Sequence, residues 1–213
     1  MKNADTTELS DEIAYVRSLA EEGRNAPLVG GVLYIVWGGL IAVAALIQFA
    51  QSAGFLNLGG GLRWAPWIAA FAFGWALSFW FGRRAHNKPG SRTVGNRTAM
   101  AAWQAVGLFM SGFFIAVAIV HERFTALGVP PYFLFSLMFP VSFGLYGVAF
   151  FASATAARLD WLRWFAIAAW GFSFLSMFLL DSAYQMLAAA VGVAVCALVP
   201  GIILMRREPS DIV

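Results

Sequence analysis

The chain has 213 residues, of which 61% are hydrophobic and only 12% are charged, and its mean hydropathy is +0.73. A soluble domain of this length cannot bury so much apolar surface, so the composition excludes an ordinary globular protein and indicates that lipid is the solvent. The formal charge of +3 would suggest nucleic acid in a soluble protein. In a membrane protein it reflects basic residues gathered on one side of the bilayer, so the expected partner is lipid and not nucleic acid. The single cysteine, Cys196, excludes an intrachain disulfide and a cysteine metal cluster.

Residues 1–26 are expected to form a hydrophilic cytoplasmic leader. Within residues 1–24, six acids minus three bases leave a net charge of −3, which argues against a polybasic lipid anchor. Leu9, Ile13, Val16 and Ala20 recur at helical spacing and predict a short amphipathic helix. Two interpretations stay open, a solvated helix lying against its own bundle and a docking helix for a partner protein.

Six apolar segments follow the leader, and each has about the 20 residues that a helix needs to cross a bilayer core. They cover residues 27–50, 64–82, 98–120, 132–154, 161–180 and 182–205. No segment alternates with period 2, so we predict an all-α fold, a polytopic bundle of six transmembrane helices over residues 27–205, with a cytoplasmic tail at 206–213. Pro140 is expected to bend the fourth segment.

The distribution of basic residues predicts the orientation. Residues 83–97 hold five basic residues and no acid, between the second and third segments. With both termini inside, the inner segments hold three, five, two and two basic residues, whereas the outer loops hold only Arg63 and Arg123. Basic residues collect on the cytoplasmic side, so we expect a multi-pass inner-membrane protein whose N and C termini are both cytoplasmic.

A weak internal similarity suggests a 3+3 inverted repeat. Trp64-x-x-Trp67 followed by Gly74 resembles Trp161-x-x-Trp164 followed by Gly171, at the start of the second and fifth segments. Inverted repeats are common in transporters. The alternative is that tryptophan gathers at membrane interfaces, and glycine in membrane helices, without any duplication.

Polar residues gather at the predicted outer ends of the helices, while no Lys, Arg, Asp or Glu lies at the centre of a segment. That absence argues against a proton relay or a voltage sensor in the middle of the membrane. An outer mouth able to hold a cation or a polar headgroup is one interpretation. Its candidate ligand-binding residues are Gln48, His121, Glu122, Arg123, Asp181 and Gln185. The alternative is an N-cap at Asp181 and a solvated helix end at residues 121–123.

Catalysis finds little support in the sequence. His86 and His121 fall on opposite sides of the predicted bundle, so they cannot share a haem or metal site within one monomer. Neither a phosphate-binding loop nor a dinucleotide fingerprint occurs. We therefore expect no catalytic residue, no metal ligand, no cofactor and no enzymatic activity.

Two functions are compatible with this pattern. The first is a carrier or substrate-binding membrane subunit for an apolar or weakly polar small molecule. Its size and span count are similar to those of the vitamin-binding subunits of energy-coupling transporters, a resemblance of architecture alone that carries no residue across. The second is a non-catalytic accessory or sensory subunit that assembles with a partner protein through the leader and the basic loop. A homo-oligomer also stays open.

Overall fold

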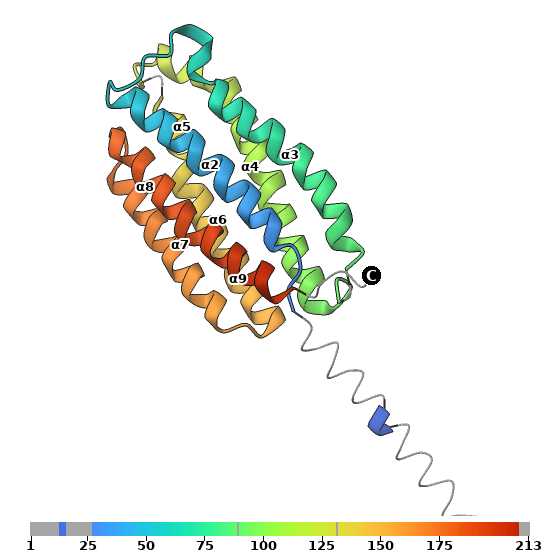
Figure 1. The fold of residues 1–213 in the computed structure, drawn as a ribbon. Helices are drawn as coiled ribbons and strands as arrows, with labels where there is room; N and C mark the ends of the chain where they lie inside the picture. Colours follow the sequence, from blue (N-terminus) through green and yellow to red (C-terminus); the bar gives the residue numbers. More distant parts are fainter. Residues whose placement is uncertain (1–12, 16–26, 89, 131, 209–213) are drawn as a thin grey trace, which may run out of the picture.

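The computed structural model describes residues 13–15, 27–88, 90–130 and 132–208, and this part of the chain contains helices and no strand. Figure 1 shows the long helices side by side in one elongated bundle. In chain order the elements are α2 (Gly31–Ser52), the 3-10 helix η1 (Gly60–Arg63), α3 (Ala65–His86), α4 (Val94–Ala126), α5 (Phe133–Ser136), α6 (Met138–Ala157), α7 (Trp161–Phe178), α8 (Ala183–Val193), the π-helix η2 (Ala194–Leu198) and α9 (Val199–Arg207). The predicted all-helical bundle is confirmed.

Five helical segments are long and apolar enough to cross a membrane, which indicates a membrane protein. They are Gly31–Ser52, Ala65–His86, Val94–Ala126, Phe133–Ala157 and Ala183–Arg207. Helix α7 is not among them, since Arg163 and three tryptophans lower the hydropathy of its 18 residues. The count of six spans and the cytoplasmic position of the termini stay predictions.

Two helices extend beyond their predicted bounds. Helix α3 continues to His86, so part of the predicted basic loop is helical. Helix α4 continues to Ala126 because no proline or glycine occurs between its predicted end at residue 120 and Gly128, whose φ of 89° ends the helix in a turn. Of the predicted leader helix, residues 13–15 are helical and exposed, and the rest lies outside the described residues.

Pro140 interrupts its segment instead of bending it. The chain leaves α5 at Ser136 and begins α6 at Met138, which places Pro140 in the first turn of α6. A proline has no N–H to donate to the carbonyl four residues earlier, here that of Ser136, and its ring crowds that carbonyl. The first turn of a helix tolerates both effects, so the break falls just before the proline.

The last segment is also irregular. It passes from α8 through the π-helical turn η2 into α9, where Pro200 is the second residue. Pro200 cannot bond to the carbonyl of Cys196, and the wider π turn accommodates the missing hydrogen bond. Both irregularities therefore follow from a proline within an apolar segment.

Helices α2 and α6 make the main packing contacts of the bundle. Helix α2 packs against α3, α8 and α9, and α6 packs against α4 and α7. Glycine allows the closest approaches: a Cβ at Gly31 would lie 2.8 Å from the Gly201 carbonyl oxygen, and a Cβ at Gly147 would collide with the indole of Trp170. Helix α3 packs mainly on α2 and leaves most of its surface exposed.

The packing resembles that of an inverted repeat at the level of helices. The first helix of each predicted triplet, α2 or α6, packs on the second helix of its own triplet and on the last helix of the other. The residues that suggested the repeat do not occupy equivalent places. A Cβ at Gly74 would meet the Trp37 ring at 2.7 Å, whereas Gly171 faces open space. The repeat stays a prediction.

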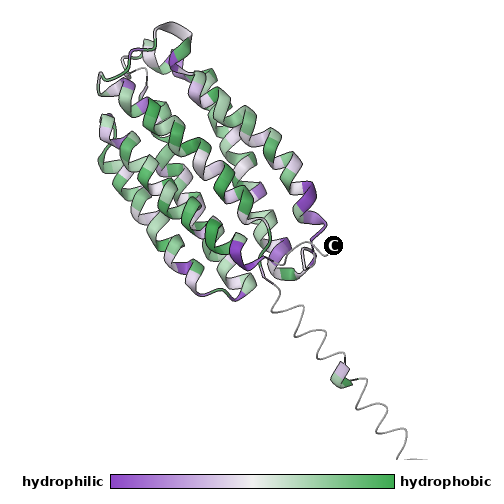
Figure 2. Ribbon diagram, viewed as in Figure 1, coloured by the Kyte–Doolittle hydropathy of each residue, from purple (hydrophilic) through white to green (hydrophobic). Residues whose placement is uncertain are grey.

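The most hydrophilic residues lie toward the two ends of the bundle (Figure 2), and basic residues are far more numerous at one end than at the other. We call one end the basic end; it contains the start of α2, the α3–α4 loop, the α6–α7 turn and the end of α9. Its described basic residues are Arg83, Arg84, Lys88, Arg92, Arg97, Arg158, Arg163, Arg206 and Arg207. The opposite end, called the far end, carries Arg63 and Arg123 among the described residues.

Candidate functional site

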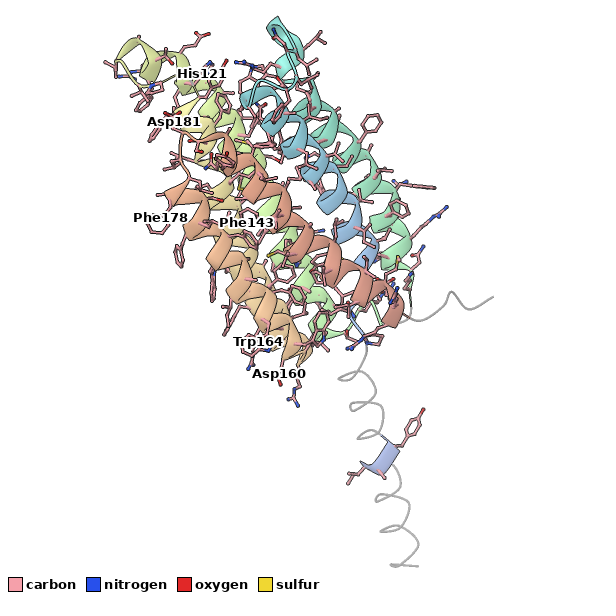
Figure 3. All side chains as sticks on the ribbon, turned by 60° about the vertical axis from the view of Figure 1, so that its left-hand side comes forward. His121, Phe143, Asp160, Trp164, Phe178 and Asp181 are labelled. Atoms are coloured by element: carbon pink, nitrogen blue, oxygen red, sulfur yellow. The ribbon has the colours of Figure 1, made fainter. Side chains whose placement is uncertain are left out.

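The residues predicted to line an outer mouth lie toward the far end, where Figure 3 places His121 and Asp181. The His121 ring lies 5.5 Å from that of Phe135, and its Nδ1 is 2.8 Å from the Ala118 carbonyl oxygen of the same helix. Glu122, Arg123 and Asp181 are exposed. The contacts of the described residues do not join these three side chains to one another.

The alternative interpretation, that Asp181 is the N-cap of α8, is wrong, because the N-cap is the next residue, Ser182. Asp181 has a φ of 62° and turns the chain between α7 and α8. Ser182 is the N-cap of α8, and its hydroxyl accepts a hydrogen bond from the Tyr184 N–H at 3.3 Å. The left-handed conformation suits aspartate better than most side chains.

Two glutamines of α2 lie near the far end in different environments. The Gln48 Oε1 accepts a hydrogen bond from Trp67 Nε1 at 3.4 Å. Gln51 is 7% exposed, and neither its Nε2 nor its Oε1 has a hydrogen-bond partner in the described part of the chain. The sequence analysis identified Gln48 and missed Gln51, although both follow the same apolar run.

Gln185 is the predicted site residue with the most specific contacts. It is 1% exposed, and its Nε2 donates to the carbonyl oxygens of Ser136 at 2.9 Å and Ser176 at 3.0 Å. The Ser136 carbonyl is free because Pro140 has no N–H, and the Ser176 carbonyl lies in the last turn of α7. One amide therefore satisfies backbone groups at two helix ends.

A group of buried polar residues surrounds this amide. We call Ser136, Pro140, Ser173, Ser176 and Gln185 the helix-break cluster, which joins α5, α6, α7 and α8. The Ser173 hydroxyl donates to the Pro140 carbonyl oxygen at 2.7 Å. The Ser176 hydroxyl is buried, with the residue 0% exposed, and has no partner among the described residues. Unpaired polar groups inside a membrane bundle are costly and often functional.

Aromatic residues adjoin the helix-break cluster. The Phe143 and Phe172 rings lie 5.7 Å apart, and both lie against Gly192 of α8. In Figure 3 Phe143 lies within the bundle, while Phe178 points away from it and is 87% exposed. An amide and a hydroxyl beside aromatic rings can hold the polar end of an otherwise apolar molecule. The cluster contains no titratable side chain for acid–base catalysis.

The basic end contains a second set of specific contacts, which the sequence analysis missed. The Glu208 Oε1 accepts from the backbone N–H groups of Gly30 at 2.7 Å and Gly31 at 2.6 Å, and its Oε2 lies 2.6 Å from Lys88 Nζ. The carboxylate thus caps α2 from the opposite end of the chain, where Gly30 supplies no side-chain cap. The sequence signal was a lone acid directly after Arg206 and Arg207.

Asn96 of α4 completes this set of contacts. Its Oδ1 accepts from the Val29 N–H at 2.8 Å, and its Nδ2 donates to the carbonyl oxygens of Pro27 at 2.9 Å and Gly90 at 3.0 Å. We call Lys88, Asn96 and Glu208 the basic-end clasp. It joins the start of α2, the α3–α4 loop and the end of α9.

The described residues contain no group of three His, Cys, Asp or Glu side chains that could hold a metal ion. His86 ends α3 at the basic end, and His121 lies near the far end. Comparison of the chain with family models, with curated proteins and with solved structures gave no match. The helix-break cluster and the basic-end clasp are the two sets of specific side-chain contacts on which a functional assignment can rest.

Proposed function

We propose that the protein is a carrier or substrate-binding membrane subunit for an apolar or weakly polar small molecule, whose polar group binds at the helix-break cluster. The observation that carries this proposal is the buried Ser176 hydroxyl, which has no partner among the described residues and lies beside the Gln185 amide, where two helices end. The adjoining Phe143 and Phe172 suit an apolar body.

Broken helices support the same assignment. Discontinuous membrane helices commonly form the binding sites of transporters, because their ends expose backbone groups that a ligand can contact. Here the α5–α6 break and the π-helical turn η2 lie in two helices that border the bundle interior. In the proposed mechanism the ligand enters at the far end, past His121 and Asp181, and its polar group bonds to Ser176.

The proposed topology has six spans: the five long apolar segments and, in addition, α7. At a rise of 1.5 Å per residue its 18 residues extend about 27 Å, close to the thickness of a bilayer core. Both termini are then on the side of the basic end, and the positive-inside rule puts that side in the cytoplasm of an inner membrane. Catalysis is not part of the proposal.

Native mass spectrometry of the full chain in mild detergent, followed by extraction of bound small molecules, tests the binding proposal. We expect a stoichiometric small molecule on the wild type. Ser176→Ala should lower its retention about fivefold, the effect of losing one hydrogen bond. Ser153→Ala is the matched control, because Ser153 is also 0% exposed and unpartnered but lies in the basic half of α6.

Two results would overturn the proposal. One is equal retention by Ser176→Ala and the wild type. The other is a wild-type protein that carries only bulk lipid and, in vesicles, neither binds nor takes up any compound of a broad metabolite panel.

An accessory or sensory role is the second candidate, favoured by the charged surface of the basic end and by the net charge of −3 of residues 1–24. Deletion of residues 1–24 distinguishes the candidates. Loss of a co-purifying partner protein, with an intact bundle and no bound small molecule in the wild type, would favour the accessory role. Unchanged ligand retention after the deletion would favour the carrier.

A further inference from the structure

The loop between α3 and α4 forms a pocket that is open to the surface at the basic end. Its volume is about 590 Å³, and residues 86–88 and 90–93 line it. Hydrogen bonds hold this loop in place. The Ser91 hydroxyl donates to the His86 carbonyl oxygen at 2.7 Å, and Asn96 Nδ2 donates to that of Gly90 at 3.0 Å. The pocket is therefore formed before any ligand arrives.

The charge of the pocket is positive. Lys88 and Arg92 line it, and Arg92 is exposed and pairs with no carboxylate in the described part of the chain. Lys88 is paired with Glu208 at 2.6 Å, so its charge is balanced and the net positive charge of the pocket comes from Arg92. The first backbone N–H groups of α4, which has no side-chain cap, add to the positive potential. The pocket suits an anion.

The position of the pocket relative to the membrane boundary indicates which anion is available to it. Phe79 and Trp80 are 65% and 51% exposed near the end of α3. The guanidinium carbons of Arg83 and Arg84 lie 4.1 Å and 4.3 Å from the centres of these rings. Exposed aromatic residues and arginines at a helix end mark the boundary between hydrocarbon and headgroups. The pocket begins two residues beyond Arg84, about 3 Å further along the axis. With the boundary at Arg83 and Arg84, this is the level expected for the lipid phosphates.

We infer that the pocket binds the headgroup phosphate of an anionic phospholipid, whose acyl chains lie along the exposed surface of α3. Arg92 contacts the phosphate, and Phe79 and Trp80 contact the upper part of the chains. Basic pockets beside membrane helices are well suited to such headgroups. The site is separate from the helix-break cluster and does not depend on the proposed function.

Native mass spectrometry after partial delipidation tests this inference, with phosphatidylglycerol as the anionic probe and phosphatidylcholine as the zwitterionic one. We expect the full chain to retain phosphatidylglycerol preferentially. Arg92→Gln should lower that preference about fivefold, since one basic residue near an anionic surface contributes about 1 kcal/mol. Arg97→Gln is the matched control, because it removes the same charge from an exposed residue of α4 outside the pocket. Arg92→Lys should restore most of the preference.

Three results would overturn the inference. Equal losses in Arg92→Gln and Arg97→Gln would mean that diffuse positive charge attracts the lipid. No loss in Arg92→Gln would mean that the pocket is not the site. Complete displacement of phosphatidylglycerol by low-millimolar inorganic phosphate would assign the pocket to free phosphate instead of lipid. Equal unfolding midpoints of the three variants and the wild type would show that each change is local.

Discussion

The two ends of the bundle are held together by different kinds of contact. At the basic end, Glu208 and Asn96 make hydrogen bonds to residues 67 to 178 positions away, and these bonds join the first and last helices to the α3–α4 loop. At the far end, the hydrogen bonds of Gln185 to the Ser136 and Ser176 carbonyls are accompanied by aromatic contacts: Phe135 lies 4.8 Å from Trp64 and 5.5 Å from His121, measured between ring centres.

This difference bears on which end can move. A buried carboxylate with three donors loses much of its stabilisation when any donor shifts, because hydrogen bonds depend strongly on distance and angle. Aromatic rings keep most of their contact area over a range of positions. The basic end is therefore suited to fix the register of the helices, and the far end is suited to open for a ligand, as the proposed function requires.

The largest effect on stability is expected from Glu208→Gln. The substitution removes the ion pair with Lys88 and turns an amide NH₂ toward either Lys88 or the N–H groups of Gly30 and Gly31. Because the Glu208 side chain is only 4% exposed, we expect a loss of about 3 kcal/mol in the free energy of unfolding. Unfolding in mixed micelles with an increasing fraction of SDS measures it.

Asp160→Asn provides the contrast within the same end. Asp160 pairs with Arg163 at 3.2 Å, but its side chain is 81% exposed, so water screens the pair. We expect no measurable change in unfolding. A loss as large as that of Glu208→Gln would show that net charge, and not the clasp, stabilises the basic end.

Asn96→Ala should have the second largest effect. It removes the acceptor of the Val29 N–H and the donor to the Pro27 and Gly90 carbonyl oxygens, at a residue that is 3% exposed. We expect a loss of about 2 kcal/mol, together with faster amide hydrogen exchange of Val29. Unchanged exchange at Val29 would contradict the role assigned to Asn96.

The sequence predicted the fold well wherever local composition determines it. Apolar length predicted the helical bundle, whereas the outer mouth stays a prediction. An irregularity at Pro140 was predicted, as a bend, since a missing N–H is a property of the residue itself. The exact form of the two irregularities, a break before Pro140 and a π turn before Pro200, depends on packing against neighbouring helices and could not be read from one segment.

The sequence did not predict the contacts that close the two ends. The acid directly after Arg206 and Arg207 marks Glu208 as unusual, but the sequence does not indicate which helix it caps, here one that begins 177 residues earlier. Gln185 was selected for its predicted exposure at a mouth, yet the fold buries it against the Ser136 and Ser176 carbonyls. Both depend on which helix ends meet, and this is a property of the tertiary structure.

Gln185→Leu should have a smaller effect than either clasp substitution. It keeps most of the side-chain volume and leaves the Ser136 and Ser176 carbonyls without their donor. Side-chain hydrogen bonds in membrane proteins average about 0.6 kcal/mol, so the loss of two should cost about 1 kcal/mol. The unfolding midpoint in SDS measures it, and Ser173→Ala, which loses one bond to Pro140, should cost about half as much. A loss above that of Asn96→Ala would reverse the proposed order of the two ends.

Among the substitutions that remove a hydrogen bond of the bundle, the smallest effect is expected from Gln48→Leu at the far end, compared with Ser78→Ala in the basic half of α3. Each removes the acceptor of an indole N–H, but the Trp67 to Gln48 distance is 3.4 Å and the Trp37 to Ser78 distance is 2.7 Å. A bond at the limit of hydrogen-bonding distance contributes little. Gln48→Leu should therefore leave the free energy of unfolding unchanged within about 0.3 kcal/mol. Ser78→Ala should lower the free energy of unfolding by about 0.6 kcal/mol. Indole N–H chemical shifts measured by NMR in the same variants show whether each bond existed. Equal costs would mean that the far end is bonded as firmly as the basic end, and its proposed freedom to open would then lose its structural basis.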